Sequence, residues 1–339
     1  MSSIIHAWAS PQAKAPLQRI EKPIENLKPM ETLIEVTACG VCHSDLHLID
    51  NDWGISTFPL VPGHEIVGRV AAVGSSVDWL KPGALVGVGW QRTACGHCEP
   101  CTTARDNMCF EKGMTCVNHW GGYADHHVTD AHYAFPLPKM DAKALAPLLC
   151  GGATVYGPLI HFLNNRHSRS ARVGVVGLGG LGHLGVKFAV AMGYEVTLFS
   201  NSPSKQKEAE AMGVHHFVSS ASEDVIKSVG RKFDLVLVTA NVDLPWGAYV
   251  QTLRTDGTLC FVGIPPSPLT IHAVELLDQR LRIAGSPIAS RSEIQSMLEF
   301  AERNEITADI ETFKMADVNT ALDRVRKGNI RYRAVLTNE

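Results

Sequence analysis

Short apolar runs separated by glycine and proline dominate the first 135 residues. Valine-rich runs such as 32–38 (TLIEVTA), 65–74 (EIVGRVAAVG) and 84–90 (ALVGVGW) have the length and composition of strands. Glycine and proline between them favour tight turns. The pattern therefore predicts a β-rich, turn-rich region from about residue 30 to 135.

The pattern changes near residue 150, where continuous apolar runs begin to alternate with helical periodicity. The predicted strands lie at 172–176, 195–200, 216–220, 233–240 and 257–263. Segments typical of helices follow at 182–193, 203–213, 223–230 and 246–254. Strands that are apolar throughout are buried on both faces, so this alternation predicts an α/β domain with a doubly wound parallel sheet. Beyond residue 285, 290–304 and 317–328 are amphipathic helices, and 331–337 is a final strand.

Composition narrows the classes of function. The chain has 339 residues, enough for two domains, and a net charge of −3, which favours neither nucleic acid nor a membrane surface as partner. The N-terminal segment has no apolar core typical of a signal peptide, and no apolar run approaches a membrane span, so we expect a cytoplasmic protein. Nine cysteines in such a protein indicate metal binding more than disulfides.

A glycine motif follows the first strand of the α/β region. Gly177, Gly179 and Gly182 form G-x-G-x-x-G, with Gly180 and Leu181 between the last two glycines. Placed between a strand and a helix, this motif is typical of a Rossmann dinucleotide site, because the glycines let backbone and helix N-terminus approach a pyrophosphate. The alternative, a glycine turn without a ligand, is disfavoured by this context.

The end of the second strand predicts which dinucleotide binds. An NAD site usually has an acidic residue there to hold the ribose 2′-hydroxyl. This chain has Ser200, Asn201 and Ser202 instead, followed by Lys205. Hydroxyls, an amide and an ammonium group can bind a 2′-phosphate, so we expect NADP(H) rather than NAD(H). A helix cap is the alternative role of this segment.

Two sets of cysteines and histidines are candidates for metal binding. Cys95, Cys98, Cys101 and Cys109 have the spacing C-x2-C-x2-C-x7-C. Four thiolates from one lobe suit a closed, structural zinc site, although an iron–sulfur cluster uses the same ligands.

The second set is dispersed along the chain. Cys42, His64 and Cys150 would form a Cys2His site with one open position, which is typical of catalytic zinc. Spacing alone does not join residues so far apart, since a single buried cysteine or histidine more often has a packing role.

Five segments in order resemble the zinc-dependent medium-chain alcohol dehydrogenases. They are CGVCHSDLH (39–47), PGHEIVG (62–68), the four-cysteine lobe, PLLCGGATVY (147–156) and the glycine segment 177–193. Within that superfamily, segments 43–70 and 199–213 and the closing RYRAVL are similar to the cinnamyl-alcohol-dehydrogenase-like branch and its bacterial broad-range NADPH-dependent aldehyde reductases. The resemblance covers nearly the whole chain.

The resemblance implies roles for individual residues. Cys42, His64 and Cys150 become the ligands of a catalytic zinc, with Glu65 behind the metal and able to approach it. Asp45 would orient His64, as metal-bound histidines require. The implied proton relay runs from the substrate oxygen through Ser44 and the cofactor's ribose hydroxyl to His47 at its outer end. The implied cofactor contacts are His43 and Arg333 at the phosphates and Thr154 beside the nicotinamide. The implied substrate-pocket residues are Trp53, Trp90 and Trp120, for which ordinary packing is nearly as good an interpretation.

The resemblance also implies an architecture and a reaction. Residues 1–148 and 285–339 would form a barrel-like catalytic domain with two zinc ions per chain, and 149–284 the NADP(H)-binding Rossmann domain. The expected reaction is hydride transfer between NADP(H) and an aldehyde or primary alcohol, by a homodimer. Cys39, Cys116 and Cys260 match no ligand position and are expected to be ordinary small side chains.

Three other functions remain open at this point. The enzyme could work mainly in the oxidative direction on cinnamyl- or benzyl-type alcohols. A zinc-free quinone reductase of the same fold is disfavoured by the cysteine sets. A nucleotide-binding zinc protein without catalysis is disfavoured because binding alone needs none of Ser44, Asp45 and Glu65.

Overall fold

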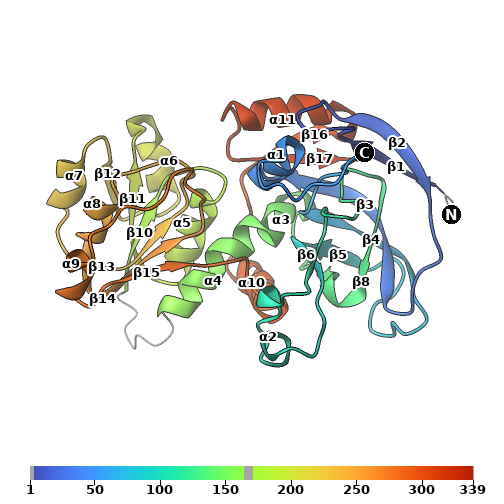
Figure 1. The fold of residues 1–339 in the computed structure, drawn as a ribbon, viewed down its shortest axis with the longest axis horizontal. Helices are drawn as coiled ribbons and strands as arrows, with labels where there is room; N and C mark the ends of the chain where they lie inside the picture. The colour runs from blue at the N-terminus through green and yellow to red at the C-terminus, as the bar shows by residue number, and fades with distance from the viewer. Residues whose placement is uncertain (1–3, 164–170, 339) are drawn as a thin grey trace. The chain divides into compact units, whose positions relative to one another are not determined.

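The computed structural model describes residues 4–163 and 171–338. The chain divides into two compact units (Figure 1): unit 1 comprises 1–151 and 290–339, and unit 2 comprises 152–289. Within the described ranges no single helix is long and apolar enough to cross a membrane. One bent pair, Ala142–Leu149 with Gly151–Leu163, passes by length and composition only when the two are taken together.

A seven-stranded sheet forms the centre of unit 1. The strand order is β16-β17-β3-β4-β5-β9, and β8 also pairs with β3. Its strands are β3 (Glu31–Val41), β4 (Ile66–Val73), β5 (Leu85–Val88), β8 (His126–Asp130), β9 (Phe135–Pro136), β16 (Ile310–Lys314) and β17 (Arg333–Thr337). Bulges in the β3–β4 pairing between Leu33 and Ile34 and between Val36 and Ala38 bend this sheet, which is how a sheet acquires strong curvature.

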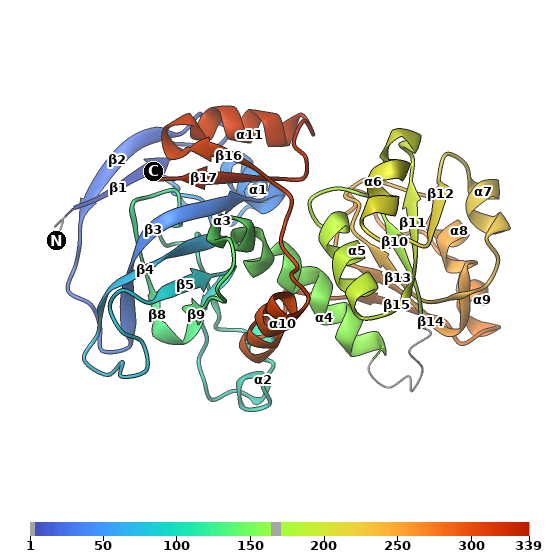
Figure 2. The same ribbon diagram turned by 180° about the vertical axis from the view of Figure 1, so that it is seen from behind.

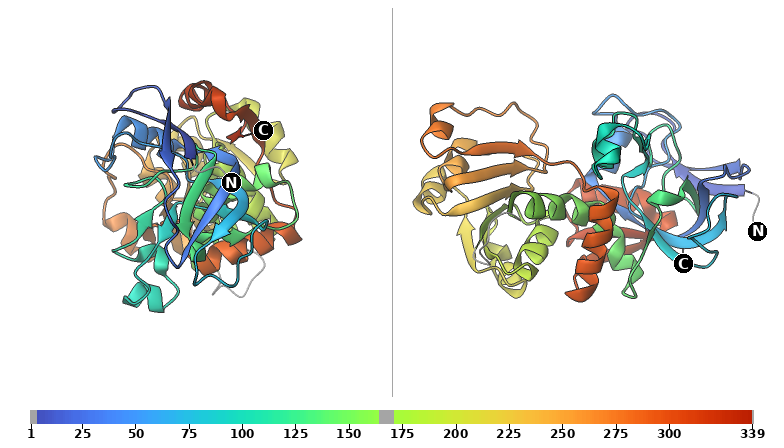
Figure 3. Two further views of the ribbon diagram at one scale, coloured as in Figure 1. Left: turned by 90° about the vertical axis from the view of Figure 1, so that its right-hand side faces the viewer. Right: turned by 90° about the horizontal axis from the view of Figure 1, so that it is seen from below.

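Segments from the two ends of the chain lie side by side in unit 1. The last strand, β17, pairs antiparallel with β3, with Val335 opposite Gly40. The views show the red C-terminal elements against the blue N-terminal ones (Figures 1, 2 and 3). The helical and two-stranded elements of unit 1 are β1 (Ile4–Ala9), β2 (Gln18–Pro23), α1 (His43–Asp50), β6 (Gln91–Thr93), α2 (Glu99–Thr102), η1 (Asp106–Met108), β7 (Gly113–Met114), η2 (Ala131–Tyr133), α3 (Ala142–Leu145), η3 (Ala146–Leu149), α10 (Arg291–Arg303), η5 (Met315–Asp317) and α11 (Val318–Arg326).

Unit 2 contains a six-stranded parallel sheet with the order β12-β11-β10-β13-β14-β15. The strands are β10 (Arg172–Val176), β11 (Glu195–Ser200), β12 (His216–Ser219), β13 (Phe233–Val238), β14 (Leu253–Phe261) and β15 (Arg282–Gly285). Its helices are α4 (Gly151–Leu163), α5 (Gly182–Ala191), η4 (Pro203–Lys205), α6 (Gln206–Ala211), α7 (Glu223–Ser228), α8 (Trp246–Val250) and α9 (Val274–Leu277). Figure 2 shows α5 and α6 on one face of the sheet and α7, α8 and α9 on the other, which confirms the doubly wound prediction.

One predicted helix is shorter than its sequence pattern. The pattern at 246–254 predicts one helix, but α8 ends at Val250 and β14 already begins at Leu253. Leu253 is fully buried and pairs in register with Phe233 of β13. Burial in the parallel sheet therefore outweighs the local helical preference.

The sequence pattern did not predict the helix at residues 43–50. Residues 43–50 form α1, whose first turn is closed by the backbone N–H of Asp45 on the carbonyl of Cys42. The many polar residues of this segment give little amphipathic pattern, so periodicity gives no signal for it.

Candidate active site and metal centres

The structure brings Cys42, His64, Glu65 and Cys150 together. One ligand atom from each lies within 4.8 Å of the others. Cys42 precedes α1, His64 and Glu65 precede β4, and Cys150 lies between η3 and α4. The pairing of β3 with β4 holds the first two segments side by side, since Cys39 is opposite Ile66.

His64 is oriented by Asp45. The Nδ1–H of His64 donates to Asp45 Oδ1 at 2.9 Å, and both side chains are fully buried. That hydrogen bond leaves the Nε2 lone pair free, and Nε2 is buried without a hydrogen-bond partner among the described residues. An orphaned imidazole nitrogen beside two sulfurs is the donor set that zinc takes in open sites, so these residues fit the metal.

Asp45 is itself held by four donors. Its carboxylate accepts hydrogen bonds from the backbone N–H groups of Cys42 and Gly63, each at 2.9 Å, in addition to His64. The Tyr123 hydroxyl donates to Oδ2 at 3.2 Å. These donors compensate the cost of burying a carboxylate and fix its direction.

The thiols near His64 have shifted protonation equilibria. The neighbouring Cys150 thiol and the nearby His64 ring hold the pKa of Cys42 well below its usual range. A depressed pKa favours the thiolate, the form that binds metal. Cys116, which matched no ligand position in the sequence, lies within 4.8 Å of Asp45 and His64 ligand atoms, and burial raises its pKa.

Glu65 is paired with Arg333. The guanidinium Nη2 contacts both carboxylate oxygens, at 2.5 and 2.6 Å, and also donates to the carbonyl of Val41 at 3.1 Å. Burial raises the pKa of Glu65 to about 8, while the positive charge of Arg333 opposes this rise. Arg333 was expected at the cofactor phosphates; the structure places its guanidinium against Glu65, beside the metal ligands.

The relay residues lie on α1. Ser44 and Asp45 are in its first turn, and His47 is in its last. The Nδ1–H of His47 donates to Asp52 Oδ2 at 2.8 Å, an interaction that the sequence analysis missed because Asp52 lies beyond the end of the helix. His43 begins the same helix.

Two of the three tryptophans lie close to these residues. Trp90 meets the His64 ring edge-on, with centroids 4.9 Å apart, and Trp53 meets Trp90 at 6.2 Å. Trp120 lies in the loop before Gly121, whose N–H donates to Val61. The carbonyl of Trp120 accepts from Nδ1 of both His119 and His127, and Lys22 lies 4.5 Å from its ring centroid.

The four-cysteine lobe forms a second cluster. The sulfurs of Cys95, Cys98, Cys101 and Cys109 lie within 4.8 Å of one another. Backbone N–H groups of His97 and Cys98 lower the pKa of Cys95 to about 6. Four sulfurs without an open position fit a structural zinc, and all nine cysteines are free thiols rather than disulfides.

The glycine loop in unit 2 joins β10 to α5. Gly177 has a φ of +94°, a backbone conformation that residues with a side chain rarely adopt. A Cβ on Gly182 would lie 2.0 Å from the Gly177 carbonyl oxygen, so there is no room for a side chain. A Cβ on Gly179 would meet nothing within 4 Å. The loop therefore offers open space at Gly179 in front of the N-terminus of α5, which suits a pyrophosphate.

The predicted 2′-phosphate residues follow β11. Lys205 Nζ donates to the Leu178 carbonyl of the glycine loop at 2.7 Å, so its charge lies beside that loop. Ser200 is buried and its hydroxyl accepts from the backbone of Ser202 at 3.2 Å. Asn201 and Ser202 form a side-chain hydrogen bond. Thr154 lies on α4.

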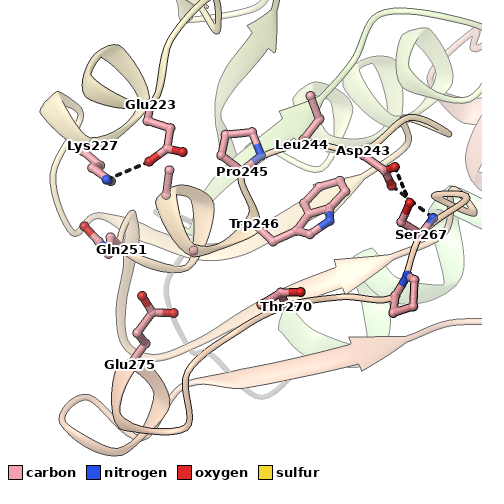
Figure 4. A pocket seen from close by; sticks show the side chains of 13 residues that line it. Glu223, Lys227, Asp243, Leu244, Pro245, Trp246, Gln251, Ser267, Thr270 and Glu275 are labelled. Atoms are coloured by element: carbon pink, nitrogen blue, oxygen red, sulfur yellow. Dashed lines mark hydrogen bonds and ion pairs between the residues drawn. The ribbon is translucent and has the colours of Figure 1, made fainter.

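Two other hollows lie away from these residues. One, of about 410 Å³, is lined by α7, the loop before α8 and Glu275, with Trp246 on its wall (Figure 4). The other, of about 510 Å³, lies between Lys14–Leu17, the end of α1 and α11. Neither is lined by a residue that the sequence predicted for the site.

Comparisons with known proteins identify two family domains and several relatives of this chain. Residues 28–139 match the alcohol dehydrogenase GroES-like domain, and 180–303 match the zinc-binding dehydrogenase domain. The chain is 40% identical over 336 residues to an aldehyde reductase AdhA of Synechocystis sp., covering 99% of each chain. It is 37% identical to cinnamyl alcohol dehydrogenase 1 of Ocimum basilicum, covering 97% of this chain and 94% of that one.

Solved structures agree with the sequence matches. A cinnamyl alcohol dehydrogenase of Sorghum bicolor superposes with a TM-score of 0.93 at 36% identity, over 98% of this chain and 97% of that one. A cinnamyl alcohol dehydrogenase of Helicobacter pylori, solved with NADP(H), gives 0.90 at 30% identity over 99% of each chain. The chain therefore belongs to the zinc-dependent medium-chain alcohol dehydrogenases, in the branch of cinnamyl-alcohol-dehydrogenase-like enzymes.

Proposed function

We propose that this protein is a zinc-dependent, NADP(H)-dependent oxidoreductase that reduces aldehydes to primary alcohols over a broad substrate range. The observation that carries the proposal is the convergence of Cys42, His64 and Cys150, with the orphaned Nε2 of His64 among them. Its relatives include a protein named aldehyde reductase. The balanced reaction is aldehyde plus NADPH plus a proton to alcohol plus NADP⁺.

A zinc ion at this site would act as a Lewis acid that polarises the aldehyde carbonyl. The chain's own residues supply the rest. Cys42, His64 and Cys150 would hold the metal, and Asp45 keeps the His64 ring in its ligating tautomer. Ser44 would donate the proton that the product oxygen needs. His47, whose Nδ1–H is held by Asp52, would take up a proton from water at Nε2 and pass it on to replace the one that Ser44 gives up. Trp53 and Trp90 would form apolar walls beside the reacting carbonyl.

The cofactor preference rests on charge. The segment after β11 has no carboxylate to repel a 2′-phosphate, and Lys205 lies beside the glycine loop. We therefore assign NADP(H), with Ser202 and Asn201 as further contacts. His43, Arg333 and Thr154 remain proposed contacts of the cofactor.

The metal count and the oligomeric state complete the proposal. Two zinc ions per chain are proposed, one catalytic and one in the four-cysteine lobe. The homodimer would form at the β15 edge of the parallel sheet, because Ile264, Val274 and Leu277 expose large apolar side chains near that edge.

One experiment tests the assignment. Purified protein is assayed with benzaldehyde, hexanal and cinnamaldehyde, and with the matching alcohols, against NADPH and NADH, and its zinc content is measured on the same sample. We expect reduction with NADPH, a preference that moves toward NADH in Ser202→Asp, and loss of turnover with retained fold in Cys150→Ala. Turnover that survives the loss of zinc from Cys150→Ala would contradict the proposal. Faster alcohol oxidation than aldehyde reduction would favour the cinnamyl-alcohol direction.

A further inference from the structure

Four aromatic rings in unit 1 form a continuous chain from a metal ligand to the outer end of the relay. His64 meets Trp90 edge-on at 4.9 Å, Trp90 meets Trp53 edge-on at 6.2 Å, and Trp53 stacks on His47 at 5.1 Å with planes 29° apart. The last contact differs in kind from the others, because one face of the His47 imidazole is covered by the indole.

The turn after α1 creates this stack. Asn51 ends the helix in the left-handed conformation, with φ of +58°, and the N–H of Asp52 returns to the carbonyl of His47 at 3.0 Å. The Ser56 hydroxyl then donates to the Leu48 carbonyl at 2.6 Å. The turn is therefore fastened to the last turn of the helix on both sides of Trp53.

Asp52 alone does not immobilise His47. It accepts from Nδ1 at 2.8 Å, which fixes the tautomer and leaves the Nε2 lone pair free. The His47 side chain is still 34% exposed, and that of Asp52 is 46% exposed, so water competes for this single hydrogen bond. A second restraint on the ring is needed to keep Nε2 in one direction.

We propose that Trp53 is a positioning residue of the proton relay: its stacked indole holds the His47 ring in the orientation that passes a proton toward Ser44. The inference rests on the proposed function and goes beyond the role of Trp53 as a pocket wall. The contact of Trp53 with Trp90 matters here, because it braces the indole against a ring that itself rests on His64.

The two roles of Trp53 make different predictions. A pocket wall contributes to aldehyde binding, so its removal changes KM in a way that depends on the aldehyde and is independent of His47. A positioning residue acts through His47, so its removal lowers kcat for every aldehyde and has no further effect once His47 is gone.

The experiment is a double-mutant cycle with Trp53→Leu and His47→Gln, measured with two aldehydes of different size. The readouts are kcat, the solvent deuterium isotope effect on kcat, and its pH profile. We expect each single variant to lower kcat by about tenfold, less than the loss of a group that hands over the proton directly. The double variant should be no slower than His47→Gln alone, and Trp53→Phe should restore most of the rate.

The chain offers a matched control. The rings of Trp79 and His132 lie 4.9 Å apart with planes tilted by 34°, and His132 Nδ1 pairs with Asp130 at 2.9 Å. The same three residue types therefore meet at a place that contains none of the proposed metal ligands or relay residues. Trp79→Leu should leave kcat and the isotope effect unchanged. Zinc content and melting temperature are recorded for all variants, so that a damaged site is recognised.

Three results would overturn the inference. If the effects of Trp53→Leu and His47→Gln multiply in the double variant, Trp53 does not act through His47. If Trp53→Leu changes only KM, it is a pocket wall alone. If His47→Gln leaves kcat and the isotope effect unchanged while NADPH-dependent reduction persists, the relay is wrong although the proposed reaction stands. Absence of aldehyde reduction in the unmodified enzyme would instead remove the proposed function.

Discussion

Single residues show how this molecule manages buried charge and polarity. Asp45 is fully buried yet accepts four hydrogen bonds, whereas His64 Nε2 is buried with no partner among the described residues. A fold that satisfies one buried group so completely does not leave its neighbour unsatisfied without reason, because each such group costs about 1–3 kcal/mol. The contrast marks the position where a metal is expected.

The buried side of His119 gives a prediction about stability at acid pH. Burial, with Arg92 nearby, lowers the pKa of His119 to about 4, and its neutral ring donates to the Trp120 carbonyl. The unfolded chain takes up this proton near pH 6.5 and the folded chain does not. Between pH 6.5 and 4 the unfolded state therefore binds more protons, and the free energy of unfolding falls as pH falls, by up to about 3 kcal/mol from this group.

His119→Gln tests this sign. The variant should be less stable than the parent at pH 7.5, because it loses the imidazole hydrogen bond, but it should lose less stability between pH 6.5 and 4. Denaturant unfolding at several pH values gives both quantities. Equal slopes for parent and His119→Gln would contradict the prediction.

At the scale of elements, the turns at the ends of helices and strands place the functional residues. α1 ends in a left-handed residue that turns Asp52 and Trp53 back to His47. The β10–α5 turn uses glycine for two different reasons: Gly182 leaves no room for a side chain, and Gly179 leaves open space. The two glycines should therefore respond differently to the same substitution.

Gly182→Ala and Gly179→Ala separate folding from binding. A methyl group at Gly182 would lie 2.0 Å from the Gly177 carbonyl oxygen, so the variant should have a clearly lower melting temperature. Gly179→Ala should melt like the parent but bind NADPH at least about tenfold more weakly, since its methyl group enters the space for the phosphates. Titration of NADPH by fluorescence and thermal unfolding without cofactor provide the two readouts; equal behaviour of both variants would refute the distinction.

The four-cysteine lobe is the second element with a testable role. Its α2 helix has four residues, and none of them is buried, so little apolar packing stabilises it. Cys98→Ser should lower the zinc content by one ion per chain and reduce the melting temperature. Cys260→Ser, which changes a cysteine outside every ligand cluster of the described residues, should keep both zinc ions. A stable Cys98→Ser protein with full zinc content would contradict a structural metal in the lobe.

At the scale of the whole molecule, the C-terminal strand pairs with a strand from the N-terminal part of the chain. β17 completes the sheet of unit 1 beside β3 and brings Arg333 to Glu65, 268 positions apart in the sequence. Unit 2 is inserted between the two parts of unit 1 and has its own parallel sheet, with β15 as a free edge.

That free edge predicts the assembly. Val274 and Leu277 are 70% and 76% exposed, which is unusual for apolar side chains near an edge strand. The double variant Val274→Glu, Leu277→Glu should convert a dimer into a monomer in light scattering after size-exclusion chromatography. Phe110→Glu, which changes an even more exposed apolar residue next to Cys109, should stay dimeric. A parent protein that is already monomeric would refute the interface.

The sequence by itself determined the fold class and the family. The run of apolar residues in each strand identified the parallel sheet, because strands buried on both faces are apolar throughout. The glycine motif and the cysteine spacing can be read directly, because their residues lie close together in the sequence. Local spacing was also enough to group the four cysteines of the lobe. The family resemblance implied that Cys42, His64 and Cys150 share a metal, although no spacing or periodicity links them, and the tertiary structure brings their ligand atoms within 4.8 Å of one another. Only the tertiary structure paired Arg333 with Glu65 and stacked Trp53 on His47. These contacts depend on strand pairing and on a helix end, and residues brought together by pairing across the chain have no periodic signal that a single sequence can display.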